Sequence, residues 1–268
     1  MLNVPLAGAM PWSQVVPTQL ASLRGVLTDI DDTLTRDGAI EPSALQALQA
    51  LAQADIPVIA ITGRPAGWSE PFALSWPVAA IVAENGGVML RRSTDGVLHH
   101  DFTQSPEVRS ANFARLQACA AAVLREVPGT TLAQDSAGRL TDIAIDHSEF
   151  AHLGPDQIDA VLRVMRSHGL TATVSSIHVN GWTGDHSKWT AAEWSVRQLT
   201  GDSFAPTDWL YVGDSTNDQL MFERMPLSVG VANIARFWAE LRVKPRFVTA
   251  GERGDGFAEV AAAILRAR

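Results

Sequence analysis

The sequence predicts an α/β protein in which a parallel-sheet core is interrupted by an inserted α+β module. Toward both ends of the chain, short apolar runs that finish in polar residues alternate with helical leucine spacing, as parallel strands and crossover helices do. The middle of the chain instead shows strand patterns typical of antiparallel pairing. We therefore expect a Rossmann-like core from residues 21–88 and 185–268, an inserted cap over residues 89–184, and an N-terminal extension over residues 1–20.

The first half of the core contains three apolar runs, each followed by a polar or glycine-rich turn. The runs are RGVLTDI (24–30), PVIAITGR (57–64) and VAAIVAENGG (78–87). The segment EPSALQALQALAQADI between the first two has helical leucine spacing. This order predicts a strand–helix–strand–helix–strand unit, whose parallel strands would place ligands at their carboxyl ends.

After Gly87 the pattern changes to that of the inserted module. VMLRR and GVLHH flank the turn STDG, which predicts a hairpin, and a long amphipathic helix opens at Ser105 and Pro106. The remaining expected elements are strands in TLAQD, RLTDIAIDHS, LTATVSS and IHVNGW, and a helix in GPDQIDAVLRVMRSHG.

The core pattern resumes with a helix at SKWTAAEWSVRQLTG. The strand DWLYVGD (208–214), the helix STNDQLMFERM, the strand LSVGV and the helix FAEVAAAILRAR follow. Because both ends of the insertion would leave the sheet at its carboxyl edge, we expect the insertion to be a lid over the ligand.

Composition narrows the possible partners. A hydrophobic content of 46% with 19% charged residues is that of a folded globular protein. The net charge is −8 and no segment forms a basic stripe, which argues against nucleic acid as a partner.

No apolar run approaches the roughly 20 residues that cross a membrane. Cys119 is the only cysteine, and the N-terminus lacks the basic region of a secretory signal, so we expect a cytoplasmic protein. Its oligomeric state stays open.

Polar residues that could carry chemistry follow the predicted strands or open the predicted helices. They are Asp29 and Asp31 in DIDDT, Thr62 in TGR, Lys188, and the GDSTND segment at 213–218. The run of acidic residues directly after the first predicted strand predicts a turn at Asp31 and Asp32, because Asp readily adopts turn conformations. Clustered carboxylates without a His or Cys group favour Mg²⁺. Carboxylates, a hydroxyl and an ammonium at one sheet edge are the groups that phosphoryl transfer needs.

The order DIDDTLT, ITGR, Lys188 and GDSTND resembles the haloacid dehalogenase (HAD) superfamily of hydrolases. The large insertion between the second and third motifs, just after ENGG at 84–87, resembles the Cof-like or IIB subfamily. That subfamily includes sucrose, mannosylglycerate and trehalose phosphate phosphatases, and phosphomannomutases. The resemblance implies a Mg²⁺-dependent phosphatase.

By matching position, the resemblance implies that Asp29 is the nucleophile and a Mg²⁺ ligand. Asp31 would give its backbone carbonyl to the metal, and its side chain would move protons. Asp214 would bind the metal directly, while Asp218, also in the metal site, and Asn217 would orient its neighbours. Thr62 and Lys188 would hold the phosphoryl group, with Gly63 and Arg64 beside them. Asp32 stands where many relatives have Gly, and we interpret it as a neutral turn residue.

Strand alternation in the insertion places Asp142, His178 and Asn180 on a polar face, opposite Ile143, Ile145 and Val179. These polar residues would suit a hydroxyl-rich substrate such as a sugar phosphate, or simply a solvated sheet face. Arg64 would contact the substrate or pair with a carboxylate of the core.

The leading hypothesis is hydrolysis of a small phosphorylated metabolite, a sugar phosphate, through an aspartyl-phosphate. A phosphosugar mutase would share these groups, and HVNGWTGDHSKW resembles the DGWDK stretch of phosphomannomutases. A phospho-accepting switch domain would also use clustered Asp, Thr and Lys around Mg²⁺. Such domains are much shorter and accept phosphate after the third strand, whereas Asp29 follows the first predicted strand.

Overall fold

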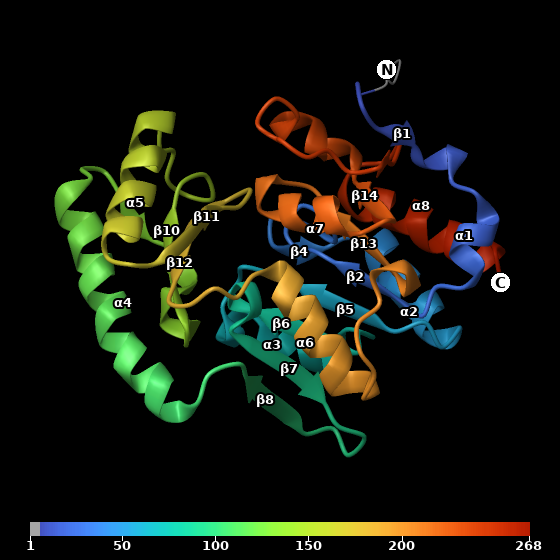
Figure 1. Ribbon diagram of the computed structural model, residues 1–268, viewed down its shortest axis with the longest axis horizontal. Coiled ribbons are helices and arrows are strands. Elements are labelled where there is room, and N and C mark those ends of the chain that lie inside the picture. Colours follow the sequence, from blue (N-terminus) through green and yellow to red (C-terminus); the bar gives the residue numbers. More distant parts are fainter. Residues whose placement is uncertain (1–5) are drawn as a thin grey trace. The chain divides into compact units, whose positions relative to one another are not determined.

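The structure is a computed structural model that describes residues 6–268 (Figure 1). The chain forms two compact units. The first comprises the described residues up to Thr62, Ser75–Ile81 and Lys188–Arg268; the second comprises Gly63–Leu74 and Val82–Ser187. The predicted division into a core and a cap at residues 89–184 is a division by function, and it stays a prediction.

The α/β class predicted from the sequence is confirmed. In the first unit, parallel strands lie in the order β1-β15-β14-β13-β2-β5; β6 follows, and its Val82 and Ala83 belong to the second unit. The strands are β1 (Met10–Pro11), β2 (Gly25–Thr28), β5 (Val58–Ile61), β6 (Ala80–Ala83), β13 (Trp209–Gly213), β14 (Ser228–Gly230) and β15 (Phe247–Val248). Every residue of β2, β5 and β13 is buried, as expected for strands covered on both faces.

The order of these strands creates a crevice between β2 and β13. The chain steps from β2 to β5 in one direction along the sheet and from β13 to β14 in the other. Right-handed crossovers therefore put the connecting helices α2 (Pro42–Gln53) and α7 (Gln219–Arg224) on opposite faces. Neighbouring strands that lead away in opposite directions leave an opening at their carboxyl ends, where α/β proteins bind ligands.

The helices α1 (Pro17–Ala21), α2 and α8 (Arg253–Arg266) pack together, and α6 (Lys188–Thr200) packs against α7. A short hairpin, β3 (Thr35–Arg36) and β4 (Ala39–Ile40), follows the DIDDT segment. Its turn is Asp37-Gly38, with positive φ at both residues, as tight hairpins require.

The second unit contains the antiparallel module that the alternation predicted. Its sheet has the order β11-β12-β10-β9. The strands are β9 (Thr131–Leu132), β10 (Asp142–Asp146), β11 (Thr171–Val174) and β12 (His178–Trp182). Helices α4 (Pro106–Glu126) and α5 (Pro155–Ser167) bury the apolar face of this sheet, including Ile143, Ile145 and Val179. The predicted hairpin is present as β7 (Val88–Arg92) and β8 (Leu98–Phe102), and α3 spans Ala66–Ser75.

Among residues 6–268, no helix is long and apolar enough to cross a membrane.

The N-terminal extension, for which the sequence predicted no element, is part of the first unit; its first five residues lie outside the described range. Strand β1 pairs in parallel with β15. Trp12 is buried, packs edge-on against Phe247 at 5.6 Å between ring centroids, and donates from Nε1 to the Glu259 carbonyl at 3.2 Å. The extension therefore completes the edge of the sheet.

Replacing Trp12 with Ala should lower the free energy of unfolding by about 3–5 kcal/mol, because it leaves a cavity beside Phe247. Urea unfolding of the full chain measures the loss. Val16→Ala is the matched control, since Val16 lies in the same segment but is exposed. Equal midpoints for Trp12→Ala and wild type would contradict an integral role for the extension.

Candidate active site

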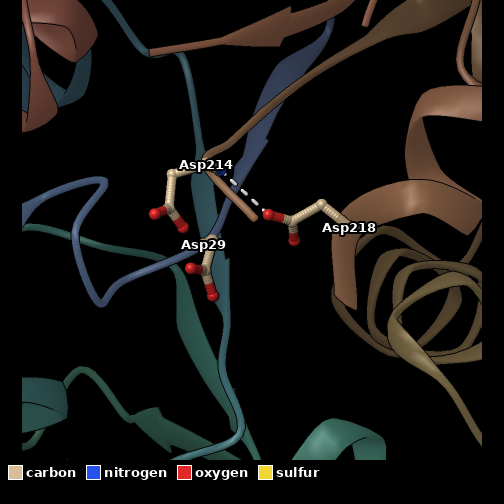
Figure 2. A group of neighbouring side chains, drawn as sticks. All are labelled: Asp29, Asp214 and Asp218. Atoms are coloured by element: carbon tan, nitrogen blue, oxygen red, sulfur yellow. Dashed lines mark hydrogen bonds between the residues drawn. The ribbon is translucent and has the colours of Figure 1, made fainter. Parts of the chain in front are cut away.

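Three buried carboxylates meet at the carboxyl ends of β2 and β13. Asp29 follows β2, Asp214 follows β13, and Asp218 ends the 3-10 helix η5 (Thr216–Asp218). One oxygen from each lies within 4.8 Å of the others, and Figure 2 shows the three side chains converging. Like charges this close and this buried repel strongly, so a cation is needed to stabilise them.

Lys188 supplies one such charge. It is the first residue of α6, is buried, and its Nζ donates to Asp29 Oδ1 and to Asp218 Oδ1 at 2.7 Å each. Burial alone would lower the pKa of Lys188, but the Asp218 and Asp29 carboxylates outweigh burial and raise it. The ammonium is therefore charged at every physiological pH.

Asp218 is fully engaged by its neighbours. Its Oδ1 accepts from Lys188 and from the Tyr211 hydroxyl. Its Oδ2 accepts from the backbone amides of Asp214 and Ser215 at 2.9 and 3.0 Å, the first of which is drawn in Figure 2. Both oxygens already have two donors, so this carboxylate is built to hold the GDSTND loop and Lys188 in place.

Asp214 has the opposite character. Its Oδ1 is buried and has no hydrogen-bond partner within residues 6–268. Its Oδ2 accepts from Asn233 Nδ2 at 3.3 Å and lies 3.5 Å from Arg236. Burial, with Asp29 and Asp218 adding to it, raises the pKa of Asp214 well above its usual range. An unsatisfied buried carboxylate oxygen is costly, and a hard divalent cation such as Mg²⁺ would satisfy it.

Burial is also the main influence on Asp29. It raises the pKa of Asp29 to about 7; Lys188 opposes this shift, while Asp218 and Asp31 add to it. A cation beside Asp29 would favour its ionised form, which is the form that can attack phosphorus.

The other predicted residues of the first unit lie around this cluster. Thr62 is buried directly after β5. Asn217 accepts from Lys188 at 3.3 Å and from Ser215 Oγ at 2.9 Å. Asp31 is half-buried and its carboxylate is not one of the three that converge, so its roles in proton transfer and through its backbone carbonyl stay predictions.

The expected turn after Asp29 is present. The Thr33 amide donates to the Ile30 carbonyl at 3.2 Å, and Asp32 has a φ of 56°. However, the interpretation of Asp32 as a neutral turn residue was incomplete. Its carboxylate pairs with Arg253 at 2.7 Å and Arg236 at 3.0 Å. Burial would raise the pKa of Asp32, but the hydrogen bonds and the charges of Arg253 and Arg236 outweigh burial and lower this pKa.

Sequence reasoning missed Asn233 and Tyr211. Asn233 donates to the Asp32 carbonyl at 2.9 Å and to Asp214, and accepts from the Arg253 amide at 2.8 Å. It lies just beyond the carboxyl end of β14, which was a usable signal because parallel strand ends converge. Tyr211 lies within β13, and nothing in the sequence pattern pointed it toward Asp218.

The remaining predicted residues form a second polar cluster, inside the second unit. Asp142 pairs with Arg139 at 2.8 Å, and Asn180 donates to Asp142 and to the Gly63 carbonyl at 3.1 Å. His178 contacts Glu149 at 2.9 Å. These side chains lie on the sheet face opposite Ile143 and Val179, as the alternation predicted; their contact with a substrate stays a prediction.

Arg64 belongs to this cluster too. It pairs with Asp135 at 3.2 Å and Glu149 at 2.8 Å. Asp135 and Glu149 both belong to the second unit; the predicted contact of Arg64 with the substrate or with a carboxylate of the core stays a prediction. Burial raises the pKa of Asp142 to about 7, with Glu84 adding and Arg139 opposing.

Comparisons with known proteins agree with this geometry. A family model described as haloacid dehalogenase-like hydrolase matches residues 26–127. A phosphoglycolate phosphatase of Methanoculleus marisnigri is 30% identical over 246 residues, covering 88% of this chain and 94% of its own. The chain belongs to the haloacid dehalogenase-like hydrolases.

Solved structures show the same fold for this HAD-type hydrolase. A crystal structure of a Thermoplasma acidophilum protein has a TM-score of 0.70 at 18% identity, covering 91% of this chain and 98% of its own. The sucrose-phosphatase of Synechocystis, solved with sucrose and phosphate, has a TM-score of 0.64 at 17% identity, covering 90% and 98%. These matches confirm the predicted fold, an α/β core together with a second α/β module.

Adding Mg²⁺ should raise the melting temperature of the full chain, because a cation that relieves the carboxylate repulsion binds only the folded state. At a concentration of a hundred times Kd the rise should be roughly 5–10 °C. Differential scanning calorimetry with Mg²⁺ and with EDTA measures it. Asp214→Asn should abolish the shift, while Asp55→Asn, a change at an exposed position of the same unit, should preserve it.

Glu149 should stabilise the second unit in a pH-dependent way. Burial would raise the pKa of Glu149, but hydrogen bonds from His178 and Arg64 outweigh burial and lower the pKa from 4.5 to about 2. A lowered folded-state pKa gives stability above pH 4.5 that is lost as the pH falls from 4.5 toward 2. Glu149→Gln should therefore cost roughly 1 kcal/mol at neutral pH and progressively less in acid. Urea midpoints across this pH range test it, with exposed Glu126→Gln as control; a pH-independent difference would contradict it.

Proposed function

We propose that this HAD-type phosphatase hydrolyses a small phosphomonoester through an aspartyl-phosphate on Asp29, with Mg²⁺ as cofactor. The observation that carries the proposal is the position of Lys188 between Asp29 and Asp218, at 2.7 Å from each. A fixed ammonium next to a carboxylate at a crevice can hold a phosphoryl group in line with that carboxylate.

In the first step an Asp29 oxygen forms a bond to phosphorus while the bond from phosphorus to the ester oxygen breaks. Asp31 gives its proton to the departing alcohol. Lys188 and Thr62 bind the phosphoryl oxygens, and charge spread over those oxygens is what they would stabilise.

In the second step a water molecule attacks the phosphorus of the aspartyl-phosphate and transfers its proton to Asp31. Inorganic phosphate leaves, and Asp29 is restored as a carboxylate. Asp31 thus ends each turnover in its starting protonation state, as alternating acid and base catalysis requires.

Asp214, with its unpartnered buried oxygen, and Asp29 would hold the Mg²⁺ directly. When bound, the ion supplies positive charge that offsets the carboxylates and the phosphoryl oxygens. Asp218, with both oxygens occupied by donors, would orient Lys188 and the loop after β13.

For the substrate we propose 2-phosphoglycolate, because two relatives aligned over 88% of this chain carry the name phosphoglycolate phosphatase. The sequence patterns favoured a sugar phosphate, so sucrose, trehalose and mannose phosphates belong in the same assay. Isomerisation of mannose 1-phosphate without phosphate release would instead support the phosphosugar mutase.

Asp29→Asn should reduce kcat for release of phosphate by about 10³-fold or more, because the amide cannot accept the phosphoryl group. The assay measures phosphate release from 2-phosphoglycolate and the sugar phosphates with Mg²⁺. EDTA should abolish turnover of wild type, and added Mg²⁺ should restore it.

Asp55→Asn, an Asp-to-Asn change at an exposed position of the first unit, is the matched control and should retain wild-type kcat. Equal kcat values for wild type and Asp29→Asn would exclude Asp29 as the nucleophile. Mass spectrometry of the acid-quenched enzyme should find a phosphoryl group on wild type and none on the Asp29 variant.

A further inference from the structure

A cavity of about 310 Å³ lies within the second unit, and none of its lining residues belongs to the carboxylate and lysine cluster. Helix α4 forms one wall, and β9, the 3-10 helix η3 (Gln134–Gly138) and the start of β10 form the rest. Phe113 and Leu132 give the cavity an apolar side, and both are partly exposed although large and hydrophobic. Its volume is in the range of small-molecule sites.

The polar side of this cavity contains an unsatisfied donor. Arg139 lines the cavity, is 7% exposed, and uses its Nη atoms for Asp142, Asp135 and the Gly63 carbonyl. Its Nε–H has no acceptor within residues 6–268. Ser136 Oγ, also on the cavity wall, is likewise buried without a partner. A buried donor that stays unpaired is unfavourable, so an oxygen of a ligand placed there would be favoured.

The charges around the cavity favour a neutral ligand. Arg139 carries the positive charge, and Asp142 and Asp135 compensate it at 2.8 and 3.1 Å. An anion would meet Asp142 on the cavity wall, and a cation would meet the guanidinium. A hydroxyl group suits both the guanidinium and the carboxylate, because it can accept from Arg139 and donate to Asp142.

We propose that this cavity is a second ligand site, which binds a neutral, hydroxylated molecule of about the size of a monosaccharide. The C–H face of such a molecule packs against Phe113 and Leu132, and its hydroxyls reach Arg139, Ser136 and Asp142. Because Arg139 also donates to the Gly63 carbonyl at 3.0 Å, the bound molecule shares a guanidinium with the residue that follows Thr62. Binding here is thereby linked to the loop after β5.

The test is an NMR titration of the ¹⁵N-labelled full chain with glucose, mannose, myo-inositol and glycerol in the millimolar range. At least one of these probes should give saturable shifts in the amides of residues 113–120, 132–143 and Gly63. Phe113→Ala, which removes the apolar wall, and Ala137→Phe, which fills the cavity from an exposed position, should each weaken binding by about ten-fold or more.

Phe150→Ala is the matched control, because Phe150 is another exposed phenylalanine of the same unit and does not line the cavity. It should titrate like wild type, and so should Asp29→Asn. The proposal is overturned if none of the four probes gives saturable shifts, or if Phe113→Ala and Ala137→Phe bind like wild type. It is also overturned if Asp29→Asn weakens binding as much as they do, because the probe would then occupy the catalytic cluster.

Discussion

The contact of Lys188 with Asp29 and Asp218 is the interaction on which the rest of the active site depends. Without a buried ammonium, carboxylates this close would repel and take up protons, and a protonated Asp29 is a poor nucleophile. Two observations show how firmly this charge is placed. Lys188 opens a helix whose first turn is packed into the unit, and Asp218 is held by two amides and the Tyr211 hydroxyl. The residues that neutralise charge in the site are thus each held by several contacts.

In the same cluster, the hydrogen bonding of Asp214 is incomplete, because its buried Oδ1 has no partner within residues 6–268. Asp218 and Asp214 are four residues apart in one loop, yet one is saturated with donors and the other is not. This difference separates a residue that positions its neighbours from a residue available to a metal. The unsatisfied oxygen is therefore what favours a metal site here, because many clusters of exposed acidic groups bind no ion.

In the second unit, buried charged groups are paired with backbone amides or with groups of opposite charge. Glu84, at a φ of 52°, accepts from the amides of Ala66, Leu140 and Thr141. Gly87 makes this arrangement possible, since a Cβ there would lie 2.0 Å from Thr141 Oγ1. Nearby, Arg64 and Arg139 share Asp135. The Arg139 Nε–H and the Ser136 Oγ, by contrast, are buried on the same cavity wall without a partner within residues 6–268.

The sequence by itself determined the α/β class, the order of the longer strands and helices, and the identity of the four motifs, because apolar periodicity and strand-end residues are local properties of the chain. It also predicted which face of β10 and β12 is polar. Only the tertiary structure decided which carboxylate is saturated, that Asn233 and Tyr211 join the site, and that Asp32 pairs with Arg236 and Arg253. These contacts join residues up to 221 positions apart, and no local pattern encodes the distance between atoms so far apart in sequence.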